Sequence, residues 1–405
     1  MATITEVDIP HGHEQRLIHI LFFIFGFGIM SWIPRFPEVR EGLNVSNGTF
    51  GSLLSMGSIG AFFGLLTVGH IIHRVGVKTV TIAAILTLFI SLSALVHTHS
   101  NLLFLILNIA FGFGITAVHV SVNSQAFHFN DRSGRNIVTA GHGYWSAGAL
   151  TTAILSGILV ERVGLALHIN ILCIVSAITM ITIVLRLHPV LLPANRNSES
   201  DYSIKQVFTS FQIDWPVSLG MACVIYLEFA VWDWGTIFTK DRLGVSAGLS
   251  TVPYITFMGS MIVGRLYIQK LLVRAPLEAW VKRAALLAGL GFGSCIILAT
   301  HLPASALWWS YSIFILGFLL GGLGSSFLGP SFFGAAVRRS NLPSAVVVGQ
   351  FGVVNNVLLF IIKWIVAWTI QFTDSFALAM MIPTTLILSS LFFIHSVKED
   401  SVRKS

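Results

Sequence analysis

The stretch GHIIHRVGVK, residues 69–78, joins two long apolar runs at residues 49–72 and 78–97. Each run is long enough to cross a bilayer as a helix, which takes about 20 residues. Arg74 and Lys78 place two cations in the short connection between them. The stretch therefore predicts a tight, positively charged turn between two membrane-spanning helices.

The composition of the whole chain extends this prediction. Its 405 residues are 55% apolar and only 10% charged, and the mean hydropathy is +0.82. A soluble domain carries roughly 25% charged residues. This scarcity of charge excludes disordered, collagenous, disulfide-framework and ordinary cytosolic classes. The three cysteines lie singly in apolar runs and are expected to be core residues. The sequence therefore predicts an all-α integral membrane protein.

Apolar runs separated by polar breaks predict twelve transmembrane helices. Several runs contain Gly and Phe in close succession, which suits helices that pack closely in a membrane. The predicted spans are residues 17–34, 49–72, 78–97, 102–128, 137–160, 165–187, 216–236, 248–270, 281–300, 306–329, 343–370 and 374–395.

The positions of the basic residues predict the orientation of these spans. With the N-terminus inside, eighteen of the 24 Lys and Arg residues fall on the cytoplasmic side, five fall outside and Lys363 lies within a span. Lys and Arg concentrate in cytoplasmic loops. We therefore expect both termini in the cytoplasm of a multi-pass protein of the plasma membrane, the inner membrane of a bacterium. The net charge of +7 reflects this orientation, and no nucleic-acid partner is expected.

A hydrophilic stretch near the middle of the chain, residues 192–214, predicts a linker between two halves. The halves resemble each other: LNVSNG at 43–48 and LGVSAG at 243–248 follow corresponding spans. Such repeats are typical of transporters that are built from two related bundles. The expected division is an N-terminal six-helix bundle at 1–188, a cytoplasmic linker at 189–215 and a C-terminal six-helix bundle at 216–405.

The turn at residues 69–78 resembles the G-x-x-x-D-R-x-G-R-K loop of the major facilitator superfamily. Gly69, Arg74, Gly76 and Lys78 match this pattern, and His73 replaces its acidic residue. The resemblance implies a fold of two pseudo-symmetric six-helix bundles. It also implies that the cations of the loop latch onto the end of a neighbouring helix. The alternative is that they are simple positive-inside anchors.

Within the superfamily, the sequence IPRF at residues 33–36 and Asn123 are similar to the fucose:proton symporter branch and related uncharacterised bacterial carriers. That branch places a carboxylate before the Pro of the first span and another four residues before the Asn. Ser31-Trp32 and His119 occupy those places here. Fucose specificity is therefore not expected.

Glu228, Asp233 and Lys363 lie well inside predicted spans, where an ionisable residue costs roughly 2.5–3.5 kcal/mol. Glu228 and Asp233 share the seventh span, and a separation of five residues turns them about 140° apart on a helix. We expect Asp233 to form an ion pair with Lys363 of the eleventh span, either as a structural contact or as a gate. No cation is expected at the depth of Glu228. This residue is a candidate for proton coupling or solute binding, with a protonated packing residue as the alternative.

Other candidates for the binding site are neutral polar and aromatic. His119 and Asn123 are spaced i, i+4 on the fourth span, which lines the cavity in the superfamily's fold, and His119 is the second candidate for proton coupling. Trp32 and Trp232 lie 200 residues apart, at equivalent places in the two halves. Ordinary helix packing is the alternative for each of these residues. The expected solute-binding set is Trp32, His119, Asn123, His142, Trp145, Glu228, Trp232, Gln350, Asn355 and Asn356.

These features predict a secondary transporter that works by alternating access. A small polar solute, such as a sugar or nucleoside, taken up together with H⁺ is the leading interpretation. The alternatives are proton-driven efflux of amphipathic compounds and a non-transporting membrane sensor on a carrier fold. The chain has no nucleophile–base motif and no metal-ligand motif, so we expect no enzyme activity, no cofactor and no metal. The expected partners are the solute, H⁺ and the lipid bilayer, and the chain is expected to be a monomer.

Overall fold

The structure is a computed structural model of the chain, and it describes residues 11–135, 137–188, 212–340 and 344–398. Most of the expected linker lies outside the described residues, which resume at Gln212. The basic residues that fall at 189–211 or 399–405 also lie outside them.

The described residues are almost wholly helical, which confirms the predicted all-α membrane fold. Eleven segments among them are long and apolar enough to cross a membrane. The one predicted span outside these eleven, the fifth at residues 137–160, corresponds to α7, which carries Gly, Ser, Thr and His. The elements in chain order are α1 (His11–Ile29), η1 (Ile33–Arg35), α2 (Phe36–Leu43), α3 (Asn47–Ser55), α4 (Gly57–Val75), α5 (Val77–Leu95), α6 (Asn101–Ser133), α7 (Val138–Leu159), α8 (Leu165–Arg186), α10 (Trp215–Leu243), α11 (Ala247–Leu272), α12 (Leu277–Leu286), η2 (Leu287–Phe292), α13 (Gly293–His301), η3 (Ala304–Ala306), α14 (Leu307–Ser325), α15 (Leu328–Arg338), α16 (Ser344–Thr373), α17 (Phe376–Ser389) and η4 (Ser390–Val397).

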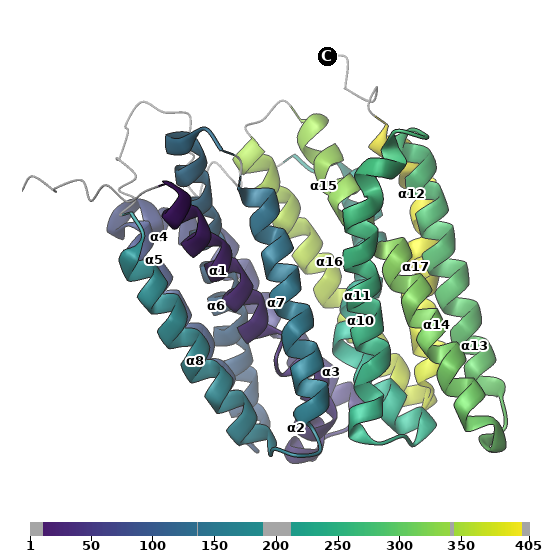
Figure 1. The fold of residues 1–405 in the computed structure, drawn as a ribbon. Helices are drawn as coiled ribbons and strands as arrows, with labels where there is room; N and C mark the ends of the chain where they lie inside the picture. Colours follow the sequence, from purple (N-terminus) through teal and green to yellow (C-terminus); the bar gives the residue numbers. More distant parts are fainter. Residues whose placement is uncertain (1–10, 136, 189–211, 341–343, 399–405) are drawn as a thin grey trace, which may run out of the picture. The chain divides into compact units, whose positions relative to one another are not determined.

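The first compact unit comprises Met1–Trp32, Ile59–Thr152 and Gly164–Asp201. Within it α5 packs against α6 and α8, and α1 packs against α6 and α8 (Figure 1). Glycines bring α1 and α7 into backbone contact: a Cβ on Gly26 would overlap the Trp145 carbonyl, and one on Gly148 would overlap the Phe23 carbonyl. Small residues that permit close approach are typical of membrane helix packing.

The second compact unit comprises Ile33–Ser58, Ala153–Val163 and Tyr202–Ser405. Its central helix is α10, which contacts α11, α14, α15, α16 and α17. The segment Ile33–Ser58 belongs to this unit because α3 packs along α16 and α2 packs on α10.

The compact units differ from the two halves that the sequence repeat predicts. The helices of the first and second spans are interrupted next to the unit boundaries. α1 ends at Ile29 and the chain resumes as η1 at Ile33, and α3 ends at Ser55 before α4 begins at Gly57. Pro34 contributes to the first break because a proline has no N–H to donate to the carbonyl four residues earlier, at Met30, and its ring clashes with that carbonyl. The division into an N-terminal bundle at 1–188 and a C-terminal bundle at 216–405 therefore stays a prediction from the sequence repeat.

Candidate solute-binding and proton-coupling residues

His119 and His142 form a pair in the first unit. His119 lies on α6 and His142 on α7, and their ring centroids are 5.7 Å apart at an angle of 64°. Phe25 and Phe22 of α1 border the pair at 6.3 and 5.5 Å. Both histidines are exposed on the unit. Their rings can therefore offer hydrogen-bonding nitrogens to a polar solute.

Asn123 continues this polar face one turn along α6. Its Nδ2 donates to the carbonyl of His119 at 2.8 Å. The side chain is half-buried. The amide oxygen remains the group that Asn123 can direct toward a solute donor.

The two tryptophans predicted for the first unit are placed differently from each other. Trp32 is only 3% exposed and packs edge-on against Phe111 with ring centroids 5.2 Å apart. It presents no open ring face in this structure, so stacking of a solute on Trp32 does not follow from its position. Trp145 is half-buried, and its backbone carbonyl contacts α1 at Gly26.

Glu228 has a cationic neighbour that the sequence analysis did not foresee. Nη2 of Arg265, on α11, lies 3.7 Å from Oε2 of Glu228, and the Glu228 side chain is 13% exposed. The expectation that no cation lies at this depth is wrong. Arg265 is one of the eighteen basic residues that the orientation predicts on the cytoplasmic side, although it falls inside the predicted span at 248–270. Its guanidinium also donates to the Ser326 carbonyl at 2.9 Å.

Other polar side chains of the second unit are buried or half-buried. The Trp232 Nε1 donates to Met258 Sδ at 3.3 Å, and the ring is half-buried. The Tyr254 hydroxyl and the Asn355 Oδ1 are buried without a hydrogen-bond partner among the described residues. Asn355 donates instead to its own helix at Phe351. Buried polar atoms of this kind carry an unmet demand for a partner.

Asp233 and Lys363 form the ion pair that the sequence predicts. Nζ of Lys363, on α16, lies 2.8 Å from Oδ2 of Asp233, on α10. Both side chains are largely buried, and Nζ also lies 4.9 Å from the Phe229 ring centroid. Glu228 and Asp233 therefore interact with different neighbouring helices, as their separation on α10 requires.

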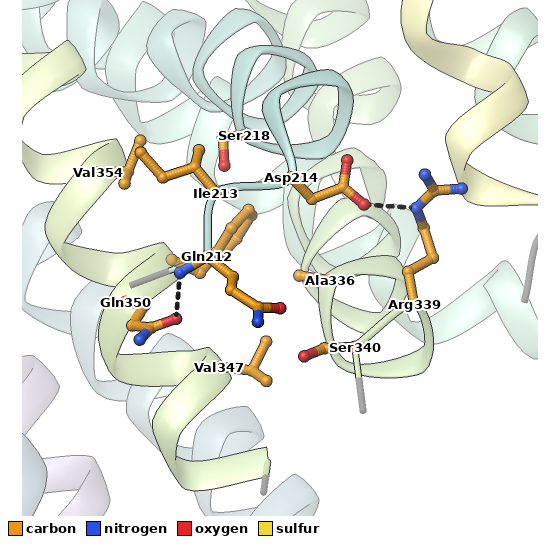
Figure 2. Close-up of a pocket in the computed structure, with 11 residues that line it drawn as sticks. Gln212, Ile213, Asp214, Ser218, Ala336, Arg339, Ser340, Val347, Gln350 and Val354 are labelled. Atoms are coloured by element: carbon orange, nitrogen blue, oxygen red, sulfur yellow. Dashed lines mark hydrogen bonds and ion pairs between the residues drawn. The ribbon is translucent and has the colours of Figure 1, made fainter. Parts of the chain in front are cut away.

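Gln350 lies in a separate pocket of about 100 Å³ at the end of the second unit where α10 begins (Figure 2). Its Oε1 accepts from the backbone N–H of Gln212 at 3.3 Å. Across the pocket, Nε of Arg339 lies 2.7 Å from Oδ2 of Asp214, which also caps α10 through the N–H of Val217. The sequence analysis missed this ion pair, although Asp214 before Trp-Pro is a typical helix start.

The turn at residues 69–78 places Gly76 and Lys78 as the resemblance implies. Gly76 adopts φ +84°, which favours glycine. Lys78 Nζ donates to the carbonyl of Leu185 at 2.9 Å, at the end of α8. His73 and Arg74 are exposed in the last turn of α4, and Gly69 has open space beside it. Lys78 therefore latches onto the end of a neighbouring helix, and Arg74 fits the alternative of a positive-inside anchor.

A charged network joins the segment Ile33–Ser58 to the rest of the second unit. Arg40 lies 2.7 Å from Asp241, and Lys240 lies 2.8 Å from Glu41. Arg35 is fully buried, pairs with Glu38 and donates to the Val163 carbonyl at 2.9 Å. Apart from these pairs, Trp368 donates to the Ser52 hydroxyl at 3.0 Å.

Comparison with known proteins defines the class of protein. Residues 18–362 match the family model described as Major Facilitator Superfamily. The chain belongs to this family of membrane transporters.

Individual relatives agree with this assignment. An uncharacterised MFS-type transporter of Yersinia pestis is 26% identical over 84% of this chain and 85% of its own. The membrane protein MosC of Rhizobium meliloti is 24% identical over 80% of this chain and 76% of its own.

Solved structures show the same fold at low sequence identity. The nucleoside transporter NupG superposes with a TM-score of 0.74 at 14% identity, over 95% of this chain and 98% of its own. A D-xylose-proton symporter gives 0.72 at 14% identity, over 98% and 99%. The predicted twelve-helix major facilitator fold is thereby confirmed.

Proposed function

We propose that this transporter takes up a small polar solute, sugar- or nucleoside-like, together with protons, across a bacterial inner membrane with both termini in the cytoplasm. One observation carries the proposal. Glu228, a carboxylate in the middle of a membrane-spanning helix, has one loose cationic neighbour among the described residues. The 3.7 Å separation from Arg265 is longer than a hydrogen bond.

A carboxylate held this loosely suits reversible protonation. When Glu228 is ionised, Arg265 compensates its charge; when Glu228 is protonated, it can donate a hydrogen bond, and Arg265 loses its counter-ion. An uncompensated charge inside a membrane segment is costly. The ionised form of Glu228 therefore favours a conformation with Arg265 close by, and the protonated form does not. This difference is what couples proton binding to a conformational change.

Neutral polar groups support a polar, uncharged solute. His119, His142 and Asn123 in the first unit, and Asn356 in the second, supply hydrogen-bond donors and acceptors without adding net charge. The structural neighbours named for nucleoside and xylose transport handle solutes of this chemical class, which favours the same class here.

The test is a measurement of solute-evoked currents on solid-supported membranes carrying proteoliposomes. A panel of pentoses, hexoses and nucleosides is applied with and without a proton gradient. We expect a proton current with the wild type and its loss in Glu228→Gln. Glu278→Gln is the matched control, because Glu278 lies on α12 and pairs with Lys398 at 3.4 Å. A current that survives in Glu228→Gln would transfer the coupling role to His119.

Proton-driven efflux is the second candidate function. Trp232 and Phe229 are half-buried with ring centroids 5.1 Å apart, and such a ring surface suits an amphipathic compound. Vesicles are loaded with a labelled tracer. If the tracer leaves only when protons flow in the opposite direction, into the vesicles, efflux is favoured over uptake.

A further inference from the structure

An apolar groove of about 270 Å³ lies between α11, α12 with η2, and α14 in the second unit. Two glycines on its lining let the helices around it approach closely. Gly324 leaves α14 in backbone contact with α12 at Ala284, and Gly264 leaves room beside the Ser326 side chain. The exposed surface of the lining is almost wholly apolar.

Cations and amphipathic aromatics stand along this groove. The guanidinium carbon of Arg283 lies 4.9 Å from the Trp280 ring centroid, and Lys270 Nζ lies 5.2 Å from that of Tyr267. Trp280, Tyr267 and Arg283 line the groove itself. Stacking on a ring orients a cation without neutralising its charge.

These charges have no counter-ion in the part of the chain that the structure describes. Neither Arg283 nor Lys270 forms an ion pair with any described residue. Glu278, the acidic residue on α12, pairs instead with Lys398. An occupant that complements this place therefore needs an apolar chain and an anionic group.

We propose that the groove binds an anionic phospholipid. One acyl chain lies in the apolar groove, and Arg283 and Lys270 hold the phosphate-bearing head group. Basic pockets between membrane helices bind lipid head groups in this way. Trp and Tyr are enriched at the membrane–water interface, where the head groups lie. A zwitterionic lipid would fill the apolar part and leave the excess positive charge uncompensated. This inference does not depend on the solute or on proton coupling.

Native mass spectrometry of the full chain in detergent tests the proposal, with equimolar phosphatidylglycerol and phosphatidylcholine as the probes. We expect the wild type to retain phosphatidylglycerol in preference to phosphatidylcholine. The double variant Arg283→Gln/Lys270→Gln should lose this preference by about fivefold for each cation removed. Arg186→Gln, an exposed cation in the last turn of α8, is the matched control and should keep the preference.

Equal retention of both lipids by the wild type would overturn the proposal, as would an unchanged preference in the double variant. A second measurement compares the wild type with Trp280→Phe and so does not depend on the folding of the double variant. Phosphatidylglycerol brominated on its acyl chains should quench Trp280 more strongly than brominated phosphatidylcholine does. The Trp280 signal is obtained by difference from Trp280→Phe. Equal quenching by the two lipids would also overturn the proposal.

Discussion

Asp233 and Lys363 give the sharpest prediction at the scale of single residues. Asp233→Asn leaves the buried Lys363 ammonium without its partner at 2.8 Å, so we expect a loss of roughly 3–5 kcal/mol in the free energy of unfolding. The double variant Asp233→Asn/Lys363→Met removes both charges and should recover most of this loss. Thermal unfolding in detergent measures both effects.

The same double variant separates a structural ion pair from a gate. If the pair only holds α10 and α16 together, the double variant, once its stability is recovered, keeps the wild-type transport rate. A double variant that unfolds at the wild-type temperature and transports no solute would assign the pair to gating. Equal destabilisation of the single and double variants would contradict the burial argument itself.

Glu161 carries a prediction about pH. Its carboxylate accepts from the Ser246 hydroxyl and from the backbone N–H of Gly248, and these hydrogen bonds hold its pKa below the usual range for glutamate. Because this pKa is depressed in the folded protein, ionised Glu161 contributes its full stabilisation of the fold above the unfolded-state pKa, about 4.3. This contribution is lost as the pH falls through the lower pKa of the folded state. Glu161→Gln should therefore lower the unfolding temperature at pH 7, and this difference should shrink as the pH falls below about 4.3.

The measurement is a series of unfolding temperatures from pH 7 to pH 3 for both proteins. Because Glu161 is exposed, water screens the interaction and the difference should be small. A gap between the two curves that stays constant down to pH 3 would show that ionisation of Glu161 is not its source.

Residue-level expectations succeeded where helix position alone decides the contact. Asp233 and Lys363 lie at matching depths on helices that neighbour each other in the superfamily's fold, so their pairing was predictable. Arg265 was not, because a count of basic residues treats a cation near a helix end as solvent-exposed. Its long side chain reaches back along the helix instead. Trp32 is buried and packs against Phe111, a residue distant in sequence.

At the scale of helices, the contact between α1 and α7 depends on glycine. A Cβ on Gly26 would overlap the Trp145 carbonyl, so Gly26→Ala forces the helices apart. We expect a destabilisation of about 1–3 kcal/mol from overpacking. Gly143→Ala on α7 is the matched control, because nothing lies within 4 Å of the added methyl group. It should leave the unfolding temperature unchanged or raise it slightly.

The outcome that would contradict this prediction is equal behaviour of the two variants. Such a result would mean that α1 and α7 adjust to the added methyl group without cost. Circular dichroism and fluorescence melts in the same detergent make the comparison direct.

The helices themselves were predictable from hydropathy. A segment that crosses the bilayer must be apolar and must satisfy its backbone hydrogen bonds internally, as a helix does. Each of the twelve predicted spans coincides with a helical segment. The interruptions at residues 30–32 and at Met56 were not foreseen. Pro34 offered a signal for the first. The second lies between Ser55 and Gly57, residue types that often accompany helix kinks.

On the scale of the whole molecule, the repeat predicted two halves, whereas contacts group Ile33–Ser58 and Ala153–Val163 with the second half. The similarity between the two halves indicates a duplication. It does not tell which segments are in contact in a given conformation. The binding residues show the same limit. Helix position predicted that His119 lies on a polar face, and only the structure pairs it with His142.

The charged network on Ile33–Ser58 gives a prediction about alternating access, which rests on the proposed function. Transport requires this segment to leave its partners on α10 in one state of the cycle. Replacing Arg40 and Lys240 by Gln removes their ion pairs with Asp241 and Glu41. At about 0.5 kcal/mol for each surface pair, the open state should gain about fivefold in population.

Ser52 supplies the reporter for this shift, because its hydroxyl accepts from Trp368 Nε1 in the closed contact. Ser52→Cys is introduced after Cys173, Cys223 and Cys295 have been replaced, and maleimide labelling is followed from outside right-side-out vesicles. Arg40→Gln/Lys240→Gln should speed labelling about fivefold. Arg162→Gln should leave the rate unchanged, since this exposed cation donates only to the Ile158 carbonyl of its own segment among the described residues. Equal rates in the two variants would mean that apolar packing of α3 on α16 holds this contact closed and that the ion pairs add nothing measurable.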